Sequence, residues 1–172
     1  MDAVWKLIDE TLLQQGDVLD GCAIPIVQSD FRYDAEGGEI EVEIRRLIVA
    51  TQSCDLENDK APYVALCPLY TLPEFRETNP KFLSKNQCES VRRGKIEGLY
   101  MLPSPSEPDD NQQSFIVDFR MIVSLPIEYL SSHASDLGER PRLNSPFVEH
   151  FSQAFARFFM RVGLPSQIPA FK

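Results

Sequence analysis

Residues 39–50 are Glu39-Ile40-Glu41-Val42-Glu43-Ile44-Arg45-Arg46-Leu47-Ile48-Val49-Ala50. Acidic and apolar residues alternate strictly in the first half, which is the pattern of a half-buried strand with three carboxylates on its solvent face. The second half is a continuous apolar run, typical of a strand at the centre of a sheet. The stretch therefore predicts one strand that runs on, or bends, into the middle of a sheet.

Four more segments carry the β-branched, apolar and aromatic residues that are typical of strands. They are residues 18–27, 63–69, 96–102 and 114–125. Turns, rather than regular crossover helices, separate most of these strands. The pattern therefore predicts a small, mainly antiparallel barrel with helices outside it.

Four segments predict helices or single helical turns from apolar spacing, caps and stop signals. They are an N-terminal helix with Val4, Trp5, Ile8 and Leu12 that ends at Gly16, about a dozen residues from Asn79-Pro80 to Gly94, a turn at 127–130 followed by a polar linker to Pro141, and a helix that begins at Ser145-Pro146 and stops at Gly163-Leu164-Pro165. Residues 51–60 are polar and are expected to leave the sheet as a loop.

The last helix carries a wide aromatic stripe made of Phe147, Phe151, Phe155 and Phe158, continued by Val162. Spacings of three and four residues place these side chains on one helix face. We expect this face to pack on the barrel or sheet. The alternative interpretation makes part of the stripe a surface for a partner protein.

The length of 172 residues suits a single domain. We expect residues 1–143 to form the barrel with the N-terminal helix, and residues 144–172 to form the C-terminal helix packed on it. The expected fold class is therefore mainly β with helices (α+β).

The charge of the chain is uneven. The net charge is −9, and residues 1–60 alone hold 14 acidic against 5 basic residues. Such an excess argues against a protein that grips nucleic acid over most of its surface, because phosphate binding needs cations at the contact.

Cysteine and histidine usage excludes the common metal patterns. The four cysteines form no C-x-x-C pair and only two histidines accompany them, so neither a metal site nor a cofactor is expected. The first residues lack the apolar run of a signal peptide, and no eighteen apolar residues run together, so we expect neither a targeting segment nor a membrane span. We therefore expect a cytoplasmic protein with reduced thiols and no membrane partner.

The order of several short motifs resembles the MazF/PemK-like toxin family. The motifs are Gly16-Asp17-Val18, Arg45-Arg46-Leu47-Ile48-Val49-Ala50-Thr51-Gln52-Ser53, Cys67-Pro68-Leu69-Tyr70-Thr71, Ser114-Phe115-Ile116-Val117-Asp118 and the short helix at Ile127–Leu130. The resemblance covers about residues 16–130 and implies an SH3-like barrel. Dimerisation is common in that family, and for this chain it stays open.

Catalytic members of the family cleave RNA without a metal, using an arginine before a proline and a hydroxyl that closes a Pro-Ile-Thr/Ser motif. The resemblance assigns Arg45 to the arginine and Tyr70 to the hydroxyl, with Thr71 displaced by one residue. Arg46 replaces the proline. A one-residue shift reverses the face of a strand side chain, and the acidic strand leads directly into Arg45. We therefore expect a protein-binding or regulatory module in a toxin–antitoxin, antiviral-defence or signalling setting, and the alternative is a metal-independent endoribonuclease of single-stranded RNA.

A third hypothesis is a nucleotide or small-molecule sensor. Its ligand or partner loop would consist of Arg46, Thr51, Gln52, Ser53, Cys54 and Asp55, placed directly after a buried strand. Cys54 is a candidate nucleophile if Asp55 and a histidine assist it. The alternative is a tight turn in which Ser53 and Asp55 cap local amides. The sequence does not place His133 or His150 near Cys54.

Overall fold

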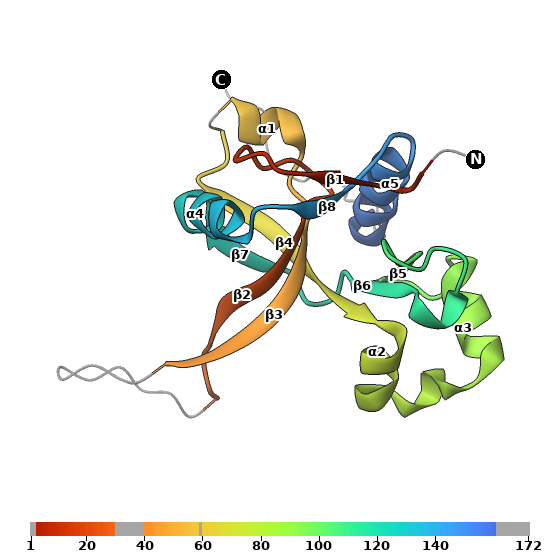
Figure 1. The fold of residues 1–172 in the computed structure, drawn as a ribbon. Coiled ribbons are helices and arrows are strands. Elements are labelled where there is room, and N and C mark those ends of the chain that lie inside the picture. The colour runs from red at the N-terminus through yellow and green to blue at the C-terminus, as the bar shows by residue number, and fades with distance from the viewer. Residues whose placement is uncertain (1–2, 30–39, 59, 161–172) are drawn as a thin grey trace, which may run out of the picture.

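A computed structural model describes residues 3–29, 40–58 and 60–160. The strands in this part of the chain are β1 (Trp5–Ile8), β2 (Val18–Ile26), β3 (Glu41–Val49), β4 (Tyr63–Thr71), β5 (Leu99–Leu102), β6 (Phe115–Asp118), β7 (Val123–Pro126) and β8 (Arg140–Leu143). The helices are α1 (Ser53–Glu57), α2 (Leu72–Thr78), α3 (Lys85–Arg92), α4 (Ile127–Leu137) and α5 (Phe147–Phe159), with 3-10 turns at Pro80–Leu83 and Asn111–Gln113. The expected mixed α+β class is confirmed (Figure 1).

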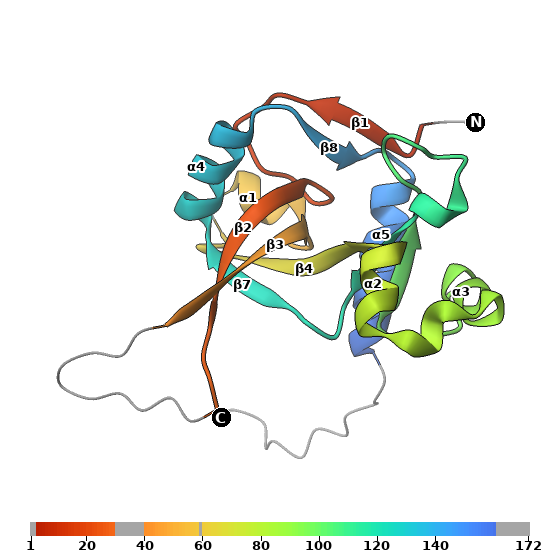
Figure 2. The same ribbon diagram turned by 60° about the horizontal axis from the view of Figure 1, so that its bottom comes forward.

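The main sheet is antiparallel, with the strand order β2-β3-β4-β6-β5, and β7 pairs with the first half of β4. A separate ribbon of β1 and β8 meets the start of β2 through a bridge between Asp17 and Arg142, and it runs from α4 to α5 (Figure 2). Within the described residues, no pairing joins the two ends of the main sheet. The sheet is therefore open and the expected barrel is not closed, whereas the expected antiparallel pairing and the mainly β class with helices are present.

The predicted N-terminal helix is also wrong. Trp5–Ile8 is strand β1, which pairs in antiparallel register with β8. Strand β8 begins at the end of the segment that the sequence predicts as a polar linker. The Trp5 indole donates to the Pro103 carbonyl at 2.8 Å. Ladder bonds to a distant segment outweigh a short helical spacing, because helix propensity is only a weak local preference.

Several element boundaries also differ from those predicted. The long helix expected after Asn79 is divided into a 3-10 turn and α3, and the strand expected over 114–125 is two strands separated by a turn. Helix α4 is longer than the turn predicted at 127–130, and α1 occupies part of the predicted 51–60 loop. Glu39 and Val162 lie outside the described residues.

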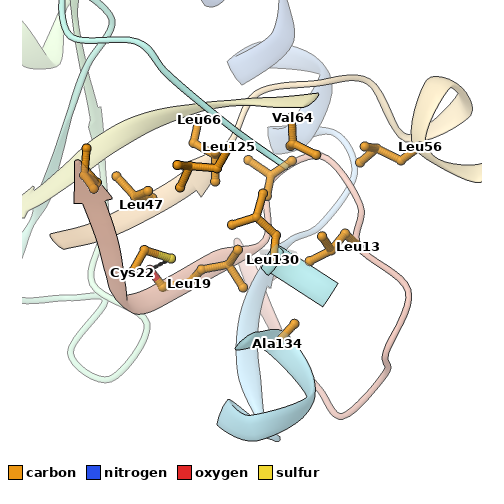
Figure 3. Close-up of a cluster of buried hydrophobic side chains, with 12 residues drawn as sticks. Leu13, Leu19, Cys22, Leu47, Leu56, Val64, Leu66, Leu125, Leu130 and Ala134 are labelled. Carbon is orange, nitrogen blue, oxygen red and sulfur yellow. Dashed lines mark hydrogen bonds between the residues drawn. The ribbon is translucent and has the colours of Figure 1, made fainter. Parts of the chain in front are cut away.

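The sheet has apolar side chains on both faces because alternate residues of β3 point in opposite directions. Leu47 and Val49 belong to a cluster that α1 and α4 cover, where Leu56 and Leu130 meet the sheet (Figure 3). Ile48 belongs to a second cluster, which contains the fully buried Phe151 of α5. The last helix thus packs on the sheet, as expected.

The outer half of β3 does not bury its apolar side chains, contrary to the sequence pattern. Val42 is 55% and Ile44 65% exposed. β3 pairs with β4 only from Leu47 onward, and its outer half pairs with β2 alone. Figure 1 shows this β2–β3 ribbon running away from the other labelled elements, so none of the described helices and strands covers it.

Candidate functional site

A groove lies where the outer half of β3 meets β4 and α2, with a volume of about 420 Å³. Its lining residues are Asp20, Gly21, Glu43, Ile44, Arg45, Arg46, Leu69, Tyr70, Glu74, Glu77 and Thr78. Four of them are carboxylates and two are arginines. We call it the acidic groove.

Arg45 and Tyr70 contact each other in the acidic groove. The paired part of β3 and β4 ends at Leu47 and Pro68. Continuing that antiparallel register places Arg45, two residues before Leu47, opposite Tyr70, two residues after Pro68. Arg45 Nη1 donates to Tyr70 Oη at 2.5 Å, and its guanidinium carbon lies 5.6 Å from the ring centroid. Arg45 Nη2 also forms an ion pair with Glu43. The arginine therefore orients the phenol and is already neutralised by a carboxylate.

The environment of Tyr70 keeps its hydroxyl protonated. Burial raises the pKa of the Tyr70 phenol, and the neighbouring Arg45 cation partly opposes this while Asp118 and Glu43 add to it. A phenol with a raised pKa is neutral near pH 7. At that pH the group can donate a proton but has none of the anionic form that a general base needs.

Arg46 points to the opposite face of β3, as alternation requires. Its guanidinium lies 3.4 Å from an Asp20 oxygen and 3.6 Å from a Glu74 oxygen, and 5.4 Å from the centroid of the Phe115 ring. Arg46 thus has two carboxylate partners. With both arginines paired, the groove carries an excess of two acidic groups over basic ones.

Thr71 serves as the N-cap of α2. Its Oγ1 accepts a hydrogen bond from the Glu74 amide at 3.3 Å, and a Glu74 carboxylate oxygen accepts from the Thr71 amide at 2.7 Å. This reciprocal pair is a capping box. The structure therefore brings Arg45 and Tyr70 together and gives Thr71 a role in starting the next helix.

The predicted ligand loop is tied to its own surroundings. Thr51 Oγ1 accepts from the Ala65 amide at 2.8 Å, and Ser53 Oγ accepts from the Gln15 amide at 3.1 Å. These bonds hold the connection between β3 and α1. None of residues 51–55 is among the residues that line the acidic groove, so the structure separates them from Arg46.

Cys54 is exposed at the start of α1. Its sulfur lies 3.7 Å from the Gln52 side-chain oxygen and 3.9 Å from an Asp55 oxygen. Both histidines contact other residues: the His133 Nε2 lies 2.6 Å from the Asp20 carbonyl, and the His150 ring is edge-on to Phe147. Within the described part of the chain, no histidine contacts the Cys54 thiol. The hypothesis that Cys54 is a nucleophile therefore has no histidine to act as the general base.

The aromatic stripe of α5 is used mainly inside the protein. Phe151 is fully buried and presents no surface to a partner. Phe147, Phe155 and Phe158 are partly buried and pack against the same cluster. Phe159, beside the stripe, is 57% exposed.

Sequence reasoning missed the acidic wall of the groove, which α2 supplies through Glu74 and Glu77. The signal was present as Thr71-Leu72-Pro73-Glu74, a capping-box pattern with proline near the helix start. Asp20 was missed because only the strand pairing of β2 with β3 brings it to Arg46.

No protein-family model matches the chain, and no curated protein matches it significantly. In residues 3–29, 40–58 and 60–160, no three His, Cys, Asp or Glu side chains are grouped so that they could hold a metal ion. None of the helices described there combines the length and apolar character needed to cross a membrane.

Proposed function

We propose that this chain is a protein-binding, regulatory module whose acidic groove takes a basic segment of a partner protein. The observation that carries the proposal is the charge balance of the groove. Four carboxylates surround two arginines, and both arginines are already paired within the protein. The remaining negative charge favours a lysine- or arginine-bearing ligand and repels phosphates.

Apolar surface beside the carboxylates adds to this proposal. Ile44 lines the groove and is 65% exposed, and Val42 is exposed on the same face of β3. Aliphatic groups next to acidic ones fit a segment that alternates basic and apolar residues. Exposed patches of this kind commonly mark protein interaction sites.

A peptide-binding measurement tests the proposal. A short synthetic peptide of alternating lysine and leucine should bind the protein in a saturable manner, as followed by fluorescence anisotropy, and more weakly as salt rises. A peptide of alternating glutamate and leucine should not bind. Absence of binding by the basic peptide, or equal binding of both peptides, would contradict the proposal.

Matched variants locate the site. Replacing Glu43 and Glu77 by glutamine removes two charges from the groove and should weaken basic-peptide binding by about tenfold or more. The control, Glu107→Gln with Asp109→Asn, removes two charges from an exposed loop outside the groove lining. Equal effects of the two double variants would mean that net charge, and not the groove, controls binding.

The setting of this module is part of the proposal. We propose that the module belongs to a cytoplasmic MazF/PemK-like protein that acts in a toxin–antitoxin, antiviral-defence or signalling context. The motif order from Gly16-Asp17-Val18 to Ile127–Leu130 supports this proposal. The four cysteines are all free, as in a reducing compartment. A neighbouring gene for a small antitoxin-like protein would support this setting, and homodimer formation stays a prediction.

The contact between Arg45 and Tyr70 favours a second candidate, a metal-independent endoribonuclease. The Arg45 guanidinium can stabilise the negative charge that develops on a phosphorane. The neutral Tyr70 phenol, whose oxygen lies 2.5 Å from Arg45 Nη1, can donate a proton to the leaving oxygen. Single-stranded RNA incubated with the protein in EDTA should then be cleaved, and Arg45→Ala and Tyr70→Phe should each abolish cleavage. Intact RNA in the presence of the wild type would rule this candidate out.

A further inference from the structure

A second cavity, separate from the acidic groove, lies between α5 and the segment that leads from α3 into β5. Its volume is about 390 Å³, within the range of small-molecule sites. Its lining residues, none of which lines the acidic groove, are Gly94, Ile96, Glu97, Gly98, Leu99, Tyr100, Phe119, His150, Gln153, Ala154, Arg157 and Phe158. We call it the α5 pocket.

Aromatic rings form the apolar wall of the α5 pocket. The Tyr100 ring stacks on Phe119 with centroids 6.1 Å apart, and Phe158 lies 6.3 Å from Phe119. Phe119 is buried and held from behind by Phe151 at 5.7 Å. Phe158 is tilted by 45° to Phe119, so the wall is a packed aromatic platform that an aromatic ligand can meet by offset stacking or edge contact.

Gly98 brings the backbone close to this platform. It has a φ of +82°, and a Cβ there would lie 2.7 Å from Arg120 Cγ and 3.0 Å from a Phe158 ring carbon. Glycine is thus required at this position by both conformation and space. The absence of a side chain leaves the pocket open beside Phe158.

Polar side chains line the pocket along one face of α5. His150, Gln153 and Arg157 follow at intervals of three and four residues, which aligns them on the helix surface. Within the described residues, the Arg157 guanidinium forms no ion pair and the Tyr100 hydroxyl has no hydrogen-bond partner. Burial raises the pKa of Tyr100, so its hydroxyl remains a donor at neutral pH. Donor groups that have no partner in the described part of the chain thus meet beside an aromatic wall.

Glu97 is the one carboxylate among the residues that line the α5 pocket. The Arg157 cation beside the aromatic wall asks for two ligand features: a flat ring and an anionic group.

We propose that the α5 pocket binds a small planar aromatic anion, with its ring against Tyr100 and Phe158 and its anionic group at Arg157. The anionic group is a phosphate, as in a nucleoside monophosphate, or a carboxylate, as in an indole acid. Arginine suits either, because its planar fork matches both groups.

Two probes distinguish these sources. Adenosine 5′-monophosphate and indole-3-acetate are titrated separately into the full-length protein, with binding followed by calorimetry and by the NMR shifts of aromatic protons. Saturable one-to-one binding of either probe supports the proposal and shows whether the pocket accepts a phosphate or a carboxylate. If neither probe binds, the proposal is overturned.

Variants of the pocket complete the test. Arg157→Gln should weaken probe binding by about tenfold or more, since it removes the cation. Lys95→Gln is the matched control, because it removes a nearby exposed cation that does not line the pocket and should leave affinity unchanged. Ala154→Trp should fill the pocket and abolish binding, with circular dichroism confirming the fold. Equal affinity of Arg157→Gln and the wild type would overturn the proposal.

Discussion

Arg140 and Asp17 lie 123 residues apart in the chain and form a buried ion pair, with Arg140 Nη2 3.0 Å from Asp17 Oδ2. Arg142 binds the same carboxylate and also Glu10, and both arginines donate to the Leu12 carbonyl. Asp17 is fully buried, and each arginine exposes no more than 3% of its side chain. One aspartate therefore joins the β1–β8 ribbon to the start of the main sheet.

Replacing Asp17 by asparagine should strongly destabilise the fold. The change leaves two buried guanidinium groups without their shared counter-charge, which costs about 3–5 kcal/mol in comparable buried pairs. Urea unfolding followed by circular dichroism measures the loss in free energy of unfolding. Glu10→Gln is the control and should cost much less, because Glu10 is 54% exposed. Similar losses in both variants would contradict the central role of Asp17.

Ionisation of the Tyr70 phenol should lower the free energy of unfolding at alkaline pH. Burial raises the pKa of its phenol, so the folded state holds the proton more tightly than the unfolded chain does. This contribution is fully present below about pH 10 and is lost as the pH rises through the higher folded-state pKa. Midpoints of thermal unfolding above about pH 10 should therefore fall more steeply for the wild type than for Tyr70→Phe. Parallel curves would show that Tyr70 titrates as an ordinary tyrosine.

Thr71→Ala should weaken α2 without disabling the acidic groove. Loss of the cap hydrogen bond to the Glu74 amide costs about 1 kcal/mol of folding free energy. Thr71→Ser retains a hydroxyl and should cost only a fraction of this. Chemical denaturation gives both values, and basic-peptide affinity should be nearly unchanged in each variant. A loss of RNA cleavage in Thr71→Ala, with the fold intact, would instead assign Thr71 a catalytic role.

Three of the four thiols, those of Cys22, Cys54 and Cys67, should react at very different rates. Burial raises the pKa of Cys22 and of Cys67 to about 12, whereas Cys54 is exposed. At about pH 8, an aromatic disulfide reagent should modify Cys54 rapidly, while Cys22 and Cys67 should react only on unfolding. Cys54→Ser should remove the fast phase, and Cys22→Ser should not affect it. Rapid modification of Cys22 or Cys67 in the folded protein would contradict their burial.

Part of the candidate site follows from sequence pattern. The resemblance named Arg45 and Tyr70 together, and the structure places them in contact. It also named Thr71, whose hydroxyl caps a helix that the sequence interpretation did not include. The α5 pocket was not predicted, because its wall combines Tyr100, Phe119 and Phe158 from separate elements and no local spacing links them.

The sequence by itself determined the elements whose signals are local: the strands that contain Leu47–Val49 and Val64–Leu66, and the helix that begins near Phe147. Only the tertiary structure decided which faces are covered. Val42 and Ile44 alternate as a buried strand does, yet they are exposed because no helix or strand in residues 3–29, 40–58 and 60–160 packs on the outer β2–β3 ribbon. Alternation reports two different faces of a strand, but burial depends on whether a distant segment arrives to cover one of them.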